Sequence, residues 1–206
     1  MKSYPISETF LSFQGEGLHM GRRAFFIRLF GCSVRCPWCD SKYTFEGTPE
    51  SVKTVQELVE SAVASSSELV VITGGEPCLH NLEPLLAALT AQGLECNLET
   101  SGTLPIRESD GVKFSWVALS PKLFSLPLDE SLKRADELKM IVSDESQLCQ
   151  YAAIAEKAKN AKVLWFEPEW SKANDTQLLR AISDFITANG GRYRAGWQIH
   201  KNYFVR

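Results

Sequence analysis

The sequence lacks the features that mark membrane, secreted and nucleic-acid-binding proteins. No apolar run approaches the roughly 20 residues that a membrane-spanning helix needs, and the segment Met1–Glu8 has no hydrophobic signal core. The 22 Lys and Arg residues are outnumbered by 25 Asp and Glu residues, so a formal net charge of -3 provides no basic field for a phosphate backbone. We therefore expect a cytoplasmic protein with a small-molecule partner, no membrane association and no direct nucleic-acid binding.

Internal repeats, low-complexity segments and a clear linker are also absent from the 206 residues. A chain of this length, with 44% hydrophobic and 23% charged residues, can bury a substantial core. We predict one domain over residues 1–206.

The six cysteines are unevenly distributed. Three of them fall within eight positions, which fits reduced thiolates in a reducing compartment better than a disulfide framework. The other three stand apart beside apolar segments, and we expect them to be small buried side chains: Cys78, Cys96 and Cys149.

Cys32, Cys36 and Cys39 form a CxxxCxxC spacing on one short segment. Thiolates are the ligands of iron-sulfur clusters, and a cluster normally takes four protein ligands, so a group of three predicts one iron left open for a small molecule. A zinc knuckle is the alternative, but structural zinc requires a closed set of four and no fourth Cys or ligand-spaced His follows.

Strand-like and helix-like segments alternate along the chain. Because such alternation indicates βαβ crossovers and six strands are too few for a closed eight-stranded barrel, we predict an α/β fold, a partial, open parallel (β/α) barrel of abbreviated size. The predicted strands are 24–30, 69–73, 95–98, 117–119, 138–142 and 163–166, and the predicted helices are 54–64, 81–91, 147–159 and 176–188, with 107–115 and 124–132 irregular.

Three predicted strands end in short polar motifs. They are Thr73-Gly-Gly-Glu-Pro77, Glu99-Thr-Ser-Gly-Thr103 and Ser120-Pro-Lys122, and the cysteine segment itself follows the strand that ends at Phe30. Ligands of parallel barrels bind at the carboxyl ends of strands, so these motifs are expected to surround one ligand, although each alone could be a turn or a cap.

Inside the first predicted strand, Arg28 requires an anionic partner or an outward, exposed position, and the alternation of the strand does not decide between them.

The cysteine spacing followed by the Gly-Gly-Glu-Pro strand end resembles the radical S-adenosylmethionine superfamily. Further motifs resemble the 7-carboxy-7-deazaguanine synthase family and occur in its order: Phe13-Gln-Gly-Glu-Gly17, Phe26-Ile-Arg-Leu29, Cys39-Asp-Ser41, Thr73-Gly-Gly-Glu-Pro77, Glu99-Thr-Ser-Gly102, Ser120-Pro-Lys122 and Gln198-Ile-His-Lys201. The resemblance implies that 6-carboxy-5,6,7,8-tetrahydropterin is contracted to 7-carboxy-7-deazaguanine with loss of ammonia, a carbon-nitrogen lyase reaction on the route to queuosine and related deazapurines.

The resemblance also assigns roles to residues, and none of them is a catalytic side chain because the chemistry belongs to the cluster and S-adenosylmethionine. A 4Fe-4S cluster would be held by Cys32, Cys36 and Cys39. S-adenosylmethionine would be bound around Trp38, Cys39, Asp40, Gly75, Ser120, Pro121 and Lys122. The substrate would meet Phe13, Gln14, Gly15, Arg28, Thr73 and His200, with Arg28 at its carboxylate.

One position departs from the family pattern. Family members usually place a threonine after Cys-Asp as a ligand of Mg²⁺, and this chain has Ser41. Serine keeps the hydroxyl oxygen, so the resemblance still implies Mg²⁺ binding at Ser41, and a helix-capping serine is the alternative.

The family habit further implies a homodimer and a reductant protein such as a flavodoxin or ferredoxin. Two other functions remain open from the residues. An activase that takes hydrogen from a glycine of a partner protein shares the cysteine spacing, and a plain iron-sulfur electron carrier would not cleave S-adenosylmethionine.

Overall fold

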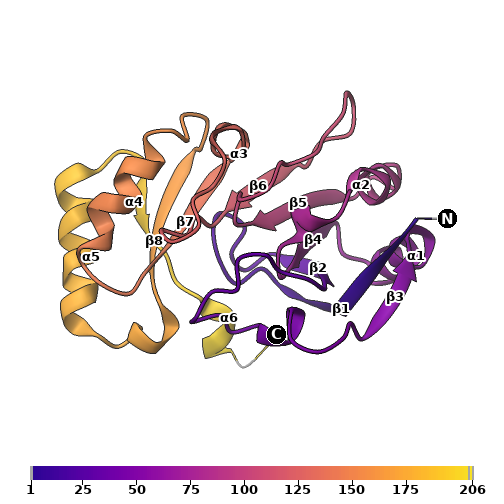
Figure 1. Ribbon diagram of the computed structural model, residues 1–206, viewed down its shortest axis with the longest axis horizontal. Helices are drawn as coiled ribbons and strands as arrows, with labels where there is room; N and C mark the ends of the chain where they lie inside the picture. The colour runs from indigo at the N-terminus through magenta and orange to yellow at the C-terminus, as the bar shows by residue number, and fades with distance from the viewer. Residues whose placement is uncertain (1, 204, 206) are drawn as a thin grey trace.

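One sheet of nine strands runs through the part of the chain that the computed structural model describes, residues 2–203 and 205 (Figure 1). The strands are β1 Ser3–Phe13, β2 Arg23–Leu29, β3 Ser51–Thr54, β4 Leu69–Gly74, β5 Glu95–Thr100, β6 Trp116–Leu119, β7 Glu137–Val142, β8 Val163–Pro168 and β9 Tyr193–Ala195. Their order in the sheet is β3-β1-β2-β4-β5-β6-β7-β8-β9. From β2 to β9 all neighbours are parallel, whereas β1 is antiparallel to both β2 and β3.

Helices connect most of the parallel strands, and two of the α-helices begin at side chains that cap them. Thr54 accepts a hydrogen bond from the Glu57 amide while the Glu57 carboxylate accepts one from the Thr54 amide, which starts the first helix. Asp175 caps the longest helix through the amides of Gln177 and Leu178. The helices are α1 Val55–Ala64, α2 Glu83–Thr90, α3 Asp129–Arg134, α4 Gln147–Ala155, α5 Thr176–Asn189 and α6 Ile199–Asn202, with 3-10 turns η1 Lys42–Thr44, η2 Pro77–Leu79 and η3 Trp170–Lys172.

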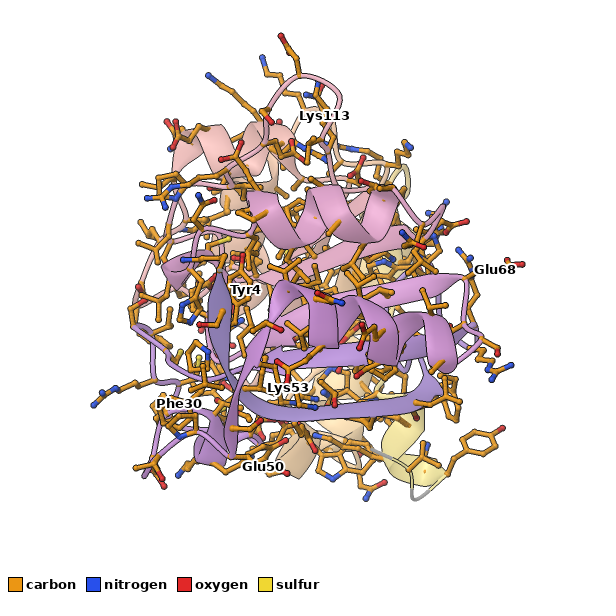
Figure 2. The ribbon with its side chains drawn as sticks, turned by 90° about the vertical axis from the view of Figure 1, so that its right-hand side faces the viewer. Tyr4, Phe30, Glu50, Lys53, Glu68 and Lys113 are labelled. Carbon is orange, nitrogen blue, oxygen red and sulfur yellow. The ribbon has the colours of Figure 1, made fainter. Side chains whose placement is uncertain are left out.

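The helices cover the outer side of the sheet in two groups. Figure 2 shows α1 and α2 side by side over the first strands, with Lys113 in a projecting loop, and Figure 1 shows α4 and α5 at the other end beside β7 and β8. Each group buries its own apolar cluster against the sheet, one around Ile27, Ile72 and Leu86 and one around Leu138, Tyr151 and Phe166. No described helix combines the length and the apolarity needed to cross a membrane.

The predicted partial parallel barrel is confirmed, and all six predicted strands are present with ends shifted by a residue or two. Three strands were not predicted. They are β1, β3 and β9, of which β1 and β3 form the antiparallel edge that pattern reasoning from βαβ units does not anticipate.

Some local predictions were wrong. Residues 124–132, predicted as irregular, include the start of α3, whose first turn carries Asp129 and Glu130 at the favourable end of the helix dipole. The predicted helix 147–159 ends at Ala155. Cys78 and Cys96 are buried as expected, but Cys149 is exposed because it lies on the outer side of α4.

Candidate active site

A cavity of about 930 Å³ opens at the carboxyl ends of the parallel strands. Its wall includes residues of β1, β2, β4, β5 and β7 and of the segments that follow them. The predicted site residues that line it are Phe13, Gln14, Gly15, Arg28, Cys32, Cys36, Trp38, Cys39, Asp40, Ser41, Thr73, Gly75, Ser120, Lys122 and His200. Pro121 is the exception, since it is buried and does not contribute to the wall.

The cysteine loop follows β2 directly, and its three thiols are free and half-buried at the cavity wall. Arg35 adopts a φ of 54° within the loop, and backbone amides point at two of the sulfurs: Arg35 N–H at Cys32 Sγ (3.5 Å) and Ser41 N–H at Cys39 Sγ (3.4 Å). Burial raises the pKa of the Cys36 and Cys39 thiols, so a positive charge must stabilise their thiolate forms.

This donor set fits an iron-sulfur cluster. Among the described residues no three His, Cys, Asp or Glu side chains converge as the ligands of a single ion. A cubane cluster makes a different demand, because each thiolate binds a separate iron atom. Three thiols spread along one loop and facing one cavity meet that demand.

Gly75 allows the end of β4 to approach the cysteine loop. A Cβ atom at this position would overlap the Gly31 carbonyl oxygen and lie 2.6 Å from Cys32 Cβ. Next to it, the Glu76 amide donates to the Gly31 carbonyl (2.8 Å), which fastens the start of the loop. The Glu76 carboxylate is buried and accepts hydrogen bonds from Thr100 Oγ1 (2.6 Å) and from the Ser101 amide (2.8 Å), so it ties β4 to β5 rather than facing a ligand.

The polar end of β6 folds back on itself. Lys122 Nζ donates to the Ser120 carbonyl (2.7 Å) and to Ser120 Oγ (2.6 Å), and Ser120 Oγ donates to the Lys139 carbonyl (2.9 Å). Burial lowers the pKa of Lys122. The charge of Lys122 in turn favours the thiolate form of Cys36 and so partly offsets the effect of burial on the pKa of that thiol. Trp38, which lines the cavity, packs edge-on against Phe124, with 5.5 Å between the ring centroids.

A charge cluster around a buried lysine forms the floor of the cavity, and no role was predicted for its three charged members from the sequence. The ammonium of Lys139 on β7 donates to Glu16 Oε2 (2.7 Å) and to Glu99 Oε2, and Gln14 Nε2 donates to Glu99 Oε1 (2.8 Å). Lys139 is 4% exposed. A lysine inside the otherwise apolar run Leu138–Val142 was the available signal, because an unpaired ammonium is not buried.

The pKa values of the three glutamates around Lys139 are shifted in different directions. Burial disfavours ionisation of Glu16, but the Lys139 charge and hydrogen bonds from Lys139 and Gln198 hold its pKa at about 2. Burial raises the pKa of Glu99, and Lys139 offsets only part of that effect. Burial and repulsion from Glu16 raise the pKa of Glu167 well above its usual value, which fits a side chain with no hydrogen-bond partner among the described residues.

The last described helix, α6 (Figure 1), contributes His200 and Lys201 to the cavity wall. Lys201 Nζ pairs with Asp40 Oδ2 (2.7 Å) and lies 5.0 Å from the Trp170 ring centroid. Burial opposes ionisation of Asp40, but the Lys201 contact outweighs it and lowers the pKa of that carboxyl. His200 packs so closely on Gly15 that a Cβ there would lie 2.6 Å from its Cγ, and burial lowers the pKa of its imidazole.

The geometry bears on two alternatives that the sequence left open. Arg28 faces the cavity with its side chain 18% exposed and pairs with Glu8, so it is not an exposed edge residue. Ser41 precedes η1 but its side chain makes no capping hydrogen bond; its hydroxyl donates to Asp40 Oδ1 (3.1 Å) at the cavity wall.

A partial parallel barrel with three free cysteines at the carboxyl ends of its strands defines a protein of the radical S-adenosylmethionine class. The sequence profile of the Radical SAM superfamily matches residues 26–143. The 7-carboxy-7-deazaguanine synthase of Synechocystis is 41% identical, over 99% of this chain and 94% of its own length, and that of Escherichia coli K12 is 36% identical over 96% and 97%. The crystal structure of QueE from Escherichia coli aligns with a TM-score of 0.80 at 32% identity, covering 95% of this chain and 94% of that one. The chain belongs to the 7-carboxy-7-deazaguanine synthase family.

Proposed function

We propose that this enzyme contracts 6-carboxy-5,6,7,8-tetrahydropterin to 7-carboxy-7-deazaguanine with loss of ammonia, as a radical S-adenosylmethionine lyase of queuosine and deazapurine biosynthesis. One observation carries the proposal. A single cavity is lined by the cysteine loop, by the inward-facing Arg28 of the strand before it and by the glycine strand end of β4, which β3 and α1 separate from the other two in the sequence. An activase acting on a partner protein, as another radical S-adenosylmethionine enzyme, would share the first and the last of these features but would not need an arginine that receives a substrate carboxylate.

The cofactor side of the cavity is the wall that includes the cysteine loop. Cys32, Cys36 and Cys39 would hold a 4Fe-4S cluster, and Trp38, Asp40, Gly75, Ser120 and Lys122 would surround S-adenosylmethionine, with the buried Pro121 between the last two. When bound, this pair of cofactors supplies the abstraction of a hydrogen atom from the substrate. The protein's own residues orient the substrate and exclude water.

The substrate side lies between the N-terminal segment and the chain end. Arg28 would receive the substrate carboxylate, and Phe13, Gln14, Gly15, Thr73 and His200 would meet its ring. The glutamates on the floor support this orientation, because a reduced pterin presents several N–H donors along one edge and Glu16 and Glu99 are hydrogen-bond acceptors.

Mg²⁺ is assigned to Ser41. Its hydroxyl lies beside the Asp40 carboxylate at the cavity wall, and hard oxygen donors of this kind suit an ion that keeps most of its waters. The remaining assignments rest on the family: a flavodoxin or ferredoxin as reductant, a homodimer and a cytoplasmic location. A sheet continuous from β3 to β9 supports one domain over 1–206.

An anaerobic turnover assay tests the function. Cluster-reconstituted protein is incubated with reductant, S-adenosylmethionine, Mg²⁺ and the carboxylated tetrahydropterin, and products are identified by chromatography and mass. We expect 7-carboxy-7-deazaguanine, and none from Cys36→Ala, with Cys149→Ala as the matched control because Cys149 is exposed on α4. Cleavage of S-adenosylmethionine with the pterin unchanged would point instead to a partner-protein substrate.

A further inference from the structure

Arg28 forms an ion pair with an acidic residue that belongs to none of the predicted motifs. Glu8 on β1 is paired directly with Arg28 on β2, and its Oε1 accepts from Arg28 Nε at 2.9 Å. Tyr43, from the turn that follows the cysteine loop, donates its hydroxyl to the same oxygen at 2.6 Å. The side chains of Glu8 and Arg28 are 12% and 18% exposed, so this pair is shielded from solvent and its geometry is well defined.

A β-bulge places Glu8 at the cavity. In a regular strand residues i and i+2 share a face, so Glu8 would point to the same side as Ile6, which is buried in the apolar core. The register instead shifts between Ile6, which pairs with Leu29, and Glu8, which pairs with Arg28. The extra residue, Ser7, reverses the parity of β1 and turns Glu8 onto the cavity side.

The contact leaves the other edge of the guanidinium available. Arg28 engages Glu8 through Nε, and among the described residues its two Nη groups make no hydrogen bond. The guanidinium also lies 5.7 Å from the centroid of the Phe10 ring, which is stacked on Phe26. Glu8 and this ring together restrict the rotation of a side chain that has high rotamer entropy when free.

We propose that Glu8, assisted by Tyr43, is a positioning residue for Arg28: it holds the guanidinium by its Nε edge so that both Nη groups form a fork for the substrate carboxylate. The inference rests on the proposed function and adds a residue that acts through Arg28 on the selection of carboxylated over uncarboxylated pterins. Because Tyr43 belongs to η1, the position of Arg28 also depends on the turn that follows the cysteine loop.

Equilibrium binding of two stable probes, 6-carboxypterin and pterin, tests the proposal in the reconstituted enzyme with S-adenosylmethionine and Mg²⁺. Pterin fluorescence reports each Kd, and the ratio of the two measures carboxylate selection. For Glu8→Ala we expect the preference for 6-carboxypterin to fall about tenfold, the equivalent of one oriented charge-assisted hydrogen bond, with the Kd of pterin unchanged. Glu8→Gln, which keeps an acceptor oxygen at the same place, should recover most of the preference. For Tyr43→Phe we expect the preference for 6-carboxypterin to fall about threefold.

Glu46→Gln is the charge-matched control, because Glu46 is exposed just beyond η1. The preference of this variant for 6-carboxypterin should equal that of the wild type. Tighter binding of 6-carboxypterin to Glu8→Ala would show that Glu8 competes for Arg28 and overturn the proposal. Equal weakening of both probes would reveal a merely structural role, and an unchanged ratio would also contradict it. A wild-type enzyme without preference for the carboxylated probe would instead remove the assignment of Arg28 and with it the proposed function.

Discussion

Replacing Lys139 by methionine should destabilise the protein strongly at neutral pH and much less in mild acid. Methionine has a similar volume but no charge, so Glu16 and Glu99 would lose the ammonium that both contact. Removing one partner of a buried ion pair typically destabilises a protein by about 3–5 kcal/mol.

The pKa of Glu16 provides an independent magnitude. Its value of about 2, against 4.5 for the ordinary side chain, corresponds to about 3 kcal/mol at 1.36 kcal/mol per pKa unit. Because the folded pKa lies below the unfolded one, this contribution is present above about pH 4.5 and is lost as the pH falls toward about 2. Without Lys139, burial should raise the pKa of Glu16, so the variant would regain stability by taking up a proton as the pH falls from 7 toward 5.

Urea unfolding of the cluster-free protein under reducing conditions, at pH 7.5 and pH 5, measures both effects. The matched control is Lys157→Met, which removes an ion pair with Asp129 whose partners are 60% and 65% exposed, and should change the free energy of unfolding by about 0–1 kcal/mol. A loss below about 1 kcal/mol for Lys139→Met at pH 7.5, or the same loss at both pH values, would refute this account of the cluster.

Three further predictions concern the rim of the cavity. Gly75→Ala should fold with an unchanged circular dichroism spectrum but bind less iron per chain on reconstitution, because its methyl group would displace the Gly31 carbonyl and the cysteine loop; full iron content would contradict this. Lys201→Ala should release the chain end from Asp40 and raise KM for the pterin severalfold with a smaller effect on kcat, and steady-state kinetics at saturating S-adenosylmethionine would detect it. Ser41→Ala should abolish stimulation of turnover by Mg²⁺ while Ser41→Thr retains it, and a Mg²⁺ titration in which both variants respond alike would remove Ser41 from the metal site.

The sequence was most informative where the residues of the site are neighbours along the chain. The cysteine loop and the polar ends of β4, β5 and β6 are short contiguous motifs, and the parallel arrangement brings strand ends to one edge, so their meeting at one cavity followed from the topology. The antiparallel edge did not follow. Pro5 and the bulge at Ser7 interrupt the alternation of β1, and period-2 reasoning therefore detects no strand there.

The charged floor of the cavity shows why some functional residues escape motif reasoning. Lys139 contacts Glu16, 123 positions earlier, and Glu99, 40 positions earlier, so no local spacing relates the three residues. Two buried ionisable residues nevertheless break a local rule: Lys139 is a cation within a buried strand, and Glu167 follows the apolar run Val163–Phe166 on another. Since burying an isolated charge is strongly unfavourable, an ionisable residue in a strand that is otherwise apolar predicts either a partner of opposite charge from another segment of the chain or a neutral form with a shifted pKa. Applied to β2, β7 and β8 together, that reasoning points to Arg28, Lys139 and Glu167, and two of these three side chains line the cavity.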